Sequence, residues 1–190
     1  MTSSSISAFR LRQKDIRSLH DPLASGVVFR KQVLGAAFTF YVSAWEAYLE
    51  AVTTEFLQKT ATPTNLPYAH IHSISRELVD QRTSRFNTPN YSNGRNLLSE
   101  CTGYDPINDW IIPPLNRGQT EQRLNEIVAI RHSFAHGFTL PAYNWLTSTT
   151  GRPRLTAKIT DDTRIFIGAL VRKTDLGLEA ILRTTFGRSW

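Results

Sequence analysis

The chain has 190 residues and a mass of 21.5 kDa, which is enough for one domain with its own hydrophobic core. Hydrophobic residues make up 41% of the sequence and charged residues 20%, a balance that excludes an intrinsically disordered chain. The formal net charge of +6 favours an acidic partner such as a nucleic acid. The single cysteine, Cys101, excludes an intramolecular disulfide and a cysteine-based zinc site.

The sequence contains no segment typical of secretion or membrane insertion. The first fifteen residues, MTSSSISAFRLRQKD, lack the apolar run of about 7–15 residues that a secretion signal needs. There is also no run of roughly 18 consecutive apolar residues that could form a transmembrane helix. We therefore expect a cytoplasmic protein without a membrane partner.

The longest helical pattern covers residues 27–59, where apolar residues recur at steps of three and four. Its apolar stripe consists of Leu34, Phe38, Tyr41, Trp45, Tyr48, Leu49, Val52 and Phe56. A second helix is expected over residues 67–82, because Pro67 suits a first helical position. A short helix, residues 95–101, is expected within an irregular segment rich in turn residues.

The next predicted helix contains LNEIVAIRHSFAHGF, residues 124–138, with Thr120 as its N-cap and Gly137 after its last turn. Residues 143–160 have strand-like composition around a glycine-containing turn, which predicts a small β-hairpin. Asp161 and Asp162 are then predicted to cap a final helix that ends near Phe186. The expected fold class is mostly α, with this hairpin as its β element.

Arg131 falls in the middle of the apolar face of its helix. At about 100° per residue, that face collects Leu124, Ile127, Val128, Ile130, Phe134 and Ala135. A guanidinium keeps its charge, so a buried one must be paired and hydrogen-bonded. Three explanations remain: its stem covers the core while its head reaches water, it pairs with a carboxylate from another helix, or it lines a cleft that binds an anion.

His136 precedes Gly137 and so falls in the last predicted turn, where the helix dipole favours the imidazolium form. A fixed cation and a titratable imidazole at one helix end suit metal-independent cleavage of RNA through its own 2′-hydroxyl. His132 and His136 also have the i, i+4 spacing of a two-histidine metal site, but the glutamate of zinc peptidases is missing between them. We therefore expect no metal and no cofactor.

The segment RHSFAHG resembles the R-x4-6-H signature of the HEPN superfamily, in which a polar residue commonly follows the arginine. Its context is similar too, because the apolar helix LNEIVAI precedes it and a glycine closes it. A long helix containing SAWEAYLEAV lies upstream, with NLLSECTGYDPINDW between the two. Over residues 27–138 this order resembles the prokaryotic RiboL-PSP/MAE-type HEPN branch.

The resemblance implies a single HEPN-like domain over residues 1–190, folded as an up-and-down helical bundle with a long second helix. It places Arg131 and His136 at catalytic positions and His132 at the polar position after the arginine. Glu46, in WEAY, matches an acidic position of the long helix, where it either orients Arg131 or faces solvent.

The resemblance also implies an activity and partners. Many HEPN members are metal-independent endoribonucleases that form homodimers, leave a 2′,3′-cyclic phosphate and act as toxins or in phage defence. The implied partners are RNA, a second copy of the chain, and an antitoxin or regulatory protein. Two alternatives stay open. One is a non-catalytic HEPN-like module for binding or dimerisation. The other is a basic nucleic-acid binder without chemistry, with Tyr91, Tyr104 and Trp110 as candidate base contacts.

Overall fold

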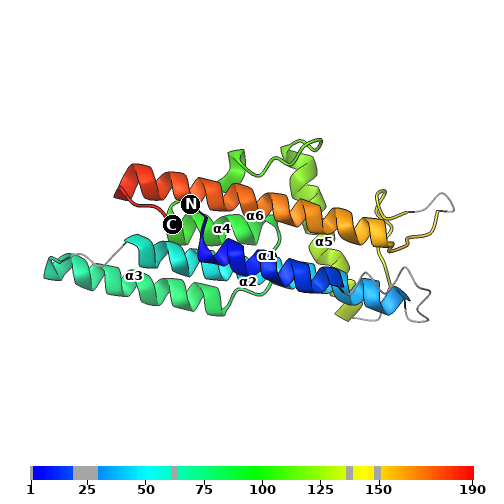
Figure 1. The fold of residues 1–190 in the computed structure, drawn as a ribbon, viewed down its shortest axis with the longest axis horizontal. Helices are drawn as coiled ribbons and strands as arrows, with labels where there is room; N and C mark the ends of the chain where they lie inside the picture. Colours follow the sequence, from blue (N-terminus) through cyan, green and yellow to red (C-terminus); the bar gives the residue numbers. More distant parts are fainter. Residues whose placement is uncertain (1, 19–29, 61–63, 136–138, 148–150) are drawn as a thin grey trace.

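The computed structural model describes residues 2–18, 30–60, 64–135, 139–147 and 151–190, which form an elongated helical bundle (Figure 1). The elements are α1 (Ser4–Ser18), α2 (Arg30–Thr60), α3 (Leu66–Ser84), α4 (Tyr91–Thr102), the 3-10 turn η2 (Pro106–Asn108), α5 (Arg117–Ala135) and α6 (Ala157–Phe186). The predicted mostly α fold class is confirmed. None of the described helices is both long and apolar enough to cross a membrane.

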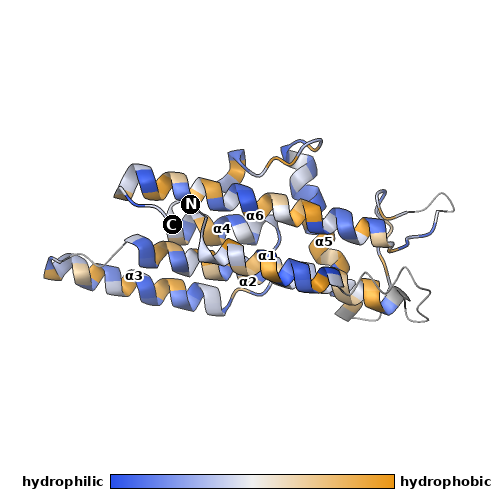
Figure 2. Ribbon diagram, in the orientation of Figure 1, coloured by the Kyte–Doolittle hydropathy of each residue, from blue (hydrophilic) through white to orange (hydrophobic). Residues whose placement is uncertain are grey.

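Helix α2 is the centre of the bundle, because it packs against α1, α3, α4, α5 and α6. All eight residues of its predicted apolar stripe are buried, and so are Ala37, Val42 and Ala44 outside the stripe. A helix that is covered on several sides buries most of its circumference. Helix α6 is different: Figure 2 shows apolar and polar residues alternating along it, as expected for a helix with one face on the core.

Helix α1 has no counterpart among the predicted elements, and its start is held by α2. The backbone N–H groups of Ser4 and Ser5 donate to the two carboxylate oxygens of Glu55 at 2.8 and 2.9 Å. The Ser5 hydroxyl donates to the same carboxylate at 2.6 Å. Ile6 and Phe9 of α1 are then buried in the common core. The first turn of α1 thus depends on a cap from a distant part of the chain.

Helix α5 begins at Arg117, so the prediction of Thr120 as its N-cap is wrong. Asn116 and Gln119 form the capping box instead. The Gln119 N–H donates to Asn116 Oδ1 at 2.9 Å, and the Asn116 N–H donates to Gln119 Oε1 at 3.0 Å. Thr120 lies buried in the first turn, where its hydroxyl donates to the Asn116 carbonyl at 2.9 Å.

Helices α4 and α6 also begin earlier than the sequence predicts. Asn90 caps α4, because its side chain accepts from the Asn93 N–H at 2.8 Å. Thr156 caps α6, because its side chain accepts from the Ile159 N–H at 3.2 Å. The predicted caps of α6, residues 161–162, therefore lie inside that helix.

The hairpin predicted over residues 143–160 is reduced to one isolated antiparallel bridge between Thr147 and Pro153, and the described residues of this range contain no strand. Trp145 instead docks on α5, where its Nε1 donates to Glu126 Oε2 at 2.6 Å. A side-chain contact with α5 therefore holds this segment in place of a strand ladder.

The cap on α1 gives a prediction for stability. Burial raises the pKa of Glu55, but hydrogen bonds from Ser5 and Ser4 outweigh burial and hold the pKa below its ordinary value. A lowered pKa stabilises the fold above the ordinary pKa of glutamate, and this contribution is lost as the pH falls through the lowered value. We expect Glu55→Gln to lower the free energy of unfolding by about 1 kcal/mol at pH 7. Urea denaturation of the wild type and the variant measures this loss of unfolding free energy, which should be smaller at about pH 3 than at pH 7. An equal loss at both pH values would contradict the prediction.

Candidate functional site at the end of helix α5

Arg131 lies in the last described turn of α5, next to the fully buried Ile130. Its side chain is 24% exposed, so the guanidinium is neither fully solvated nor sealed in the core. Its Nη2 lies 3.1 Å from Oε2 of Glu46 in α2, whose side chain is 14% exposed. Its Nη1 donates to the backbone carbonyl of Asn87 at 3.3 Å. Of the three explanations for Arg131, the structure therefore contains the ion pair with a carboxylate from another helix.

Glu46 stands at the edge of the buried stripe of α2, directly after Trp45. Burial raises the pKa of its carboxyl above the ordinary value, although the positive charges of Arg131 and His132 lower it. Burial, followed by the negative charge of Glu46, also raises the pKa of Glu50 one turn further along. Burial thus outweighs the nearby positive charge, so the pKa of Glu46 stays raised even though its carboxylate lies 3.1 Å from Arg131.

The connection between α3 and α4, residues 85–90, is fixed by side chains from three helices. The carbonyls of residues 87, 88 and 89 accept hydrogen bonds from Arg131 of α5 at 3.3 Å, Asn93 of α4 at 3.0 Å and Trp45 of α2 at 3.0 Å. Three consecutive carbonyls held in this way leave the connection little freedom. Arg131 therefore joins α5 both to α2 and to residues 85–90.

Two predicted site residues remain to be placed. His132 is exposed and follows Arg131 on α5. His136 lies outside the described residues, as does Gly137, and α5 is described up to Ala135, the residue before it. Among the residues that the structure describes, no group of three or more His, Cys, Asp or Glu side chains is arranged to hold a metal. The described site is therefore Arg131, Glu46, His132 and the Asn87 carbonyl.

The aromatic residues of the irregular segment do not belong to this site. Tyr91, Tyr104 and Trp110 are all buried, so the suggestion that they contact a base is wrong. Trp110 packs edge-to-face on Trp45 with 5.6 Å between ring centroids. Its Nε1 donates to the Thr174 hydroxyl at 2.9 Å. The three aromatic side chains are part of the core, where their rings pack against other buried side chains.

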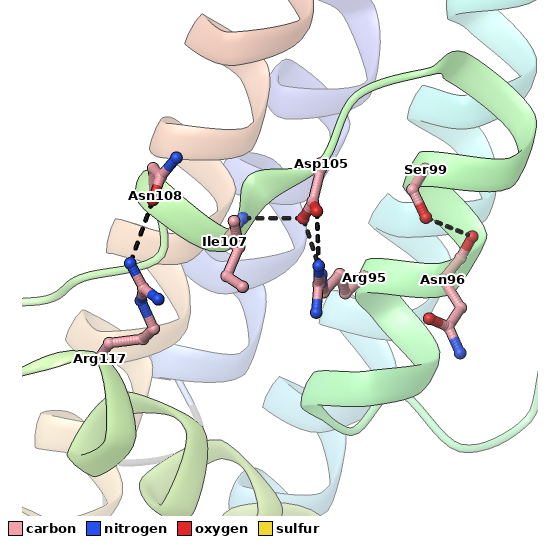
Figure 3. Close-up of polar contacts among 7 residues, drawn as sticks. All are labelled: Arg95, Asn96, Ser99, Asp105, Ile107, Asn108 and Arg117. Atoms are coloured by element: carbon pink, nitrogen blue, oxygen red, sulfur yellow. Dashed lines mark hydrogen bonds and ion pairs between the residues drawn. The ribbon is translucent and has the colours of Figure 1, made fainter.

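Two neighbouring arginines have structural partners in the connection between α4 and α5. Arg95 donates to Asp105 through Nε at 2.7 Å and through Nη2 at 2.6 Å, and Asp105 also accepts from the Ile107 N–H at 3.1 Å (Figure 3). Arg117 donates to Asn108 Oδ1 at 3.1 Å. These contacts hold η2 between the two helices, away from Glu46 and the end of α5.

One protein-family model, described as RiboL-PSP-HEPN, matches residues 7–161 of the chain. The chain belongs to the RiboL-PSP-HEPN family. The match begins in α1 and ends near the start of α6. It therefore includes more of the chain than residues 27–138, over which the sequence alone showed the RiboL-PSP-HEPN resemblance. It supports a HEPN-type function, which is often that of a ribonuclease. No curated protein and no solved structure matches the chain.

The ion pair of this RiboL-PSP-HEPN protein gives a prediction that can be measured without any activity. We expect a double-mutant cycle with Glu46→Gln and Arg131→Met to give a coupling energy of about 1–2 kcal/mol, between the values for exposed and buried pairs. The control pair is Lys158–Asp162, which has an N–O distance of 2.7 Å but side chains that are 82% and 52% exposed. Its coupling energy should be about 0.3–0.5 kcal/mol. Equal coupling in the two cycles would show that burial adds nothing to the Arg131 pair.

Proposed function

We propose that this protein is a metal-independent endoribonuclease in which Arg131 and His136 are the catalytic residues. The observation that carries the proposal is the fixed, half-buried guanidinium of Arg131, held by Glu46 and the Asn87 carbonyl in the last described turn of α5. These two contacts use two of its five N–H donors, and a guanidinium binds phosphoryl oxygens with its remaining donors. Family membership supports the same activity.

The proposed reaction uses the 2′-hydroxyl of the RNA as the nucleophile. His136 accepts the proton of this hydroxyl while the 2′ oxygen forms a bond to phosphorus. The bond between phosphorus and the 5′ oxygen breaks, and the 5′ oxygen takes up the proton. Arg131 donates to the non-bridging oxygens, where negative charge grows in the transition state. The products are a 2′,3′-cyclic phosphate and a 5′-hydroxyl, and no metal or cofactor takes part.

Two supporting roles complete the proposal. Glu46 orients Arg131 through the 3.1 Å ion pair. His132 is exposed and follows Arg131 on α5. Its imidazole would hydrogen-bond to the RNA backbone, which the net charge of +6 attracts.

We propose that the active unit is a homodimer acting in the cytoplasm, with RNA as its substrate. A toxin or phage-defence effector, restrained by an antitoxin or another regulatory partner, is the cellular role that we propose from family membership.

A non-catalytic HEPN-like module for binding or dimerisation is the alternative. One observation favours it, because the two described contacts of Arg131 join α5 to α2 and to residues 85–90 and so give the arginine a structural role. An arginine that only links these elements would make the same contacts. The two functions differ in what happens to RNA, so cleavage assays separate them.

The first assay is cleavage of total RNA in excess EDTA. We expect the wild type to cleave RNA in EDTA, because the proposed reaction uses no metal. We expect Arg131→Met and His136→Ala each to lower the cleavage rate by at least about a hundredfold. Gel analysis of timed samples gives the rates, and circular dichroism confirms that each variant is folded.

Matched controls for this assay come from exposed residues on other elements. Arg76→Met and His70→Ala, both on α3, remove the same side-chain types from exposed positions. Both controls should cleave RNA at the wild-type rate. The ribonuclease proposal fails if folded wild type leaves RNA intact, and the metal-independent reaction fails if EDTA stops cleavage.

The proposed homodimer has its own test. Light scattering after size exclusion should give a molar mass twice that of the 21.5 kDa chain, because a symmetric pair is the commonest closed assembly. A mass that stays at the single-chain value up to concentrations of about 100 μM, where a biologically relevant dimer would assemble, contradicts the proposal.

A further inference from the structure

Helices α1 and α6 lie side by side in opposite directions (Figure 1). Just before α1, the hydroxyl and the backbone N–H of Ser3 donate to the carboxylate of Asp175 in α6. Further along α1, the Gln13 amide donates to the backbone carbonyl of Arg164 at 3.2 Å. A step forward along α1 is therefore a step backward along α6, and these two contacts give the register of the pair.

A cavity of about 270 Å³ opens between these two contacts. The register places Arg10 across from Gly168 of α6, where no side chain fills the space between the helices. A Cβ atom at Gly168 would make only ordinary contacts with the Gln13 amide, the closest at 3.6 Å. Arg164 and Arg172 stand four residues before and after Gly168, so they share its face of α6. Both line the cavity together with Arg10, so three arginines surround one opening.

Most N–H donors of these arginines are not engaged. Arg164 donates through Nε to Asp161 at 2.7 Å, and its side chain is 22% exposed. Arg10 and Arg172 are exposed, and within the described residues neither has an ion pair. Arg17, seven residues after Arg10, lies on the same side of α1 and continues the row of cations. Asp161 offsets one of these four charges, so the α1–α6 groove, which consists of the cavity and Arg17, is strongly basic.

The repulsion between these arginines favours an anion in the groove. Like charges around one opening destabilise each other, and an anion between them removes this repulsion. About 12 Å along α6 separates Arg164 from Arg172, and about 10 Å along α1 separates Arg10 from Arg17, at 1.5 Å per residue. A row of cations of this length suits the successive phosphates of one strand better than a single free phosphate.

We propose that the α1–α6 groove binds the sugar-phosphate backbone of the RNA and takes no part in the chemistry at Arg131. The inference rests on the proposal that the substrate is RNA. Guanidiniums that contact phosphates carry no sequence information, so the groove raises the affinity for RNA of any sequence. Arg164 and Arg172 follow residues 7–161, the part of the chain that the RiboL-PSP-HEPN model matches. Family membership therefore does not account for this groove.

The test measures binding, so it does not depend on cleavage. The probe is a fluorescein-labelled, single-stranded RNA of mixed sequence and about 20 nucleotides, long enough for several phosphate contacts. It is fully 2′-O-methylated, so the nucleophile is blocked. Fluorescence anisotropy at several KCl concentrations gives the dissociation constant and its salt dependence. The double variant Arg10→Gln/Arg172→Gln should bind about tenfold more weakly at about 100 mM KCl. Its slope of log Kd against log[KCl] should fall by about 1.4, because each phosphate contact to a single strand contributes about 0.7.

The control variant removes the same charge from other places. Arg76→Gln/Arg188→Gln changes exposed arginines on α3 and after α6, away from the groove. Its dissociation constant should stay within about twofold of the wild-type value, because distant surface charges are screened at this salt concentration. All the changed residues are exposed, so both double variants should unfold at the wild-type temperature, which a thermal melt checks.

The outcomes separate this inference from the proposed activity. Weaker binding by the groove variant alone, without any cleavage of unmodified RNA by the wild type, would support the groove and overturn the ribonuclease. Cleavage of RNA, combined with wild-type affinity of the groove variant for the probe, would overturn the groove and leave the ribonuclease standing. Equal weakening by both double variants would also overturn the groove, since it would show a response to net charge alone. Release of the probe by inorganic phosphate, at constant ionic strength, would overturn the assignment to an RNA backbone in favour of free phosphate.

Discussion

The ion pair between Arg131 and Glu46 is the constraint around which the site is built. A permanently charged guanidinium stands beside the buried Ile130, and such a charge is tolerated only with a partner and hydrogen bonds. Glu46 supplies the partner because α2 runs through the centre of the bundle and contacts α5. The Asn87 carbonyl supplies the second contact. Displacing α2 or α5 would separate Arg131 from Glu46 and leave each partly buried charge without its partner.

The same constraint reaches the connection between α3 and α4. Trp45 and Glu46 are neighbours in α2, and both help to hold this connection. Trp45 donates a hydrogen bond directly to the Pro89 carbonyl. Glu46 pairs with Arg131, which donates to the Asn87 carbonyl. The connection is therefore positioned by the same residues that position Arg131.

The sequence predicted the features that depend on local periodicity. The three- and four-residue spacing of apolar residues predicted α2. For Glu46, the family resemblance left two positions open, against Arg131 or in solvent, and the structure has its carboxylate 3.1 Å from Arg131. The start of α5 was predicted wrongly although its signal is local. Thr120 was predicted as the N-cap, whereas the reciprocal Asn116–Gln119 capping box lies one turn earlier. Helix α1 was missed for another reason: its cap, Glu55, lies in a different helix, and no local pattern encodes it. Likewise, the Asn87 contact is made by a backbone carbonyl, whose position sequence spacing does not specify.

The chemical nature of the RNA ends tests the central claim most directly, since that claim assigns Arg131 and His136 to attack by the 2′-hydroxyl. Mass spectrometry of the fragments that the purified protein produces in EDTA identifies both ends of each cut. Our account predicts 2′,3′-cyclic phosphates and 5′-hydroxyls from the wild type, and no cleavage at positions where the preceding ribose is replaced by 2′-deoxyribose. Fragments with 3′-hydroxyl and 5′-phosphate ends, or cleavage that tolerates the 2′-deoxy substitution, would contradict it.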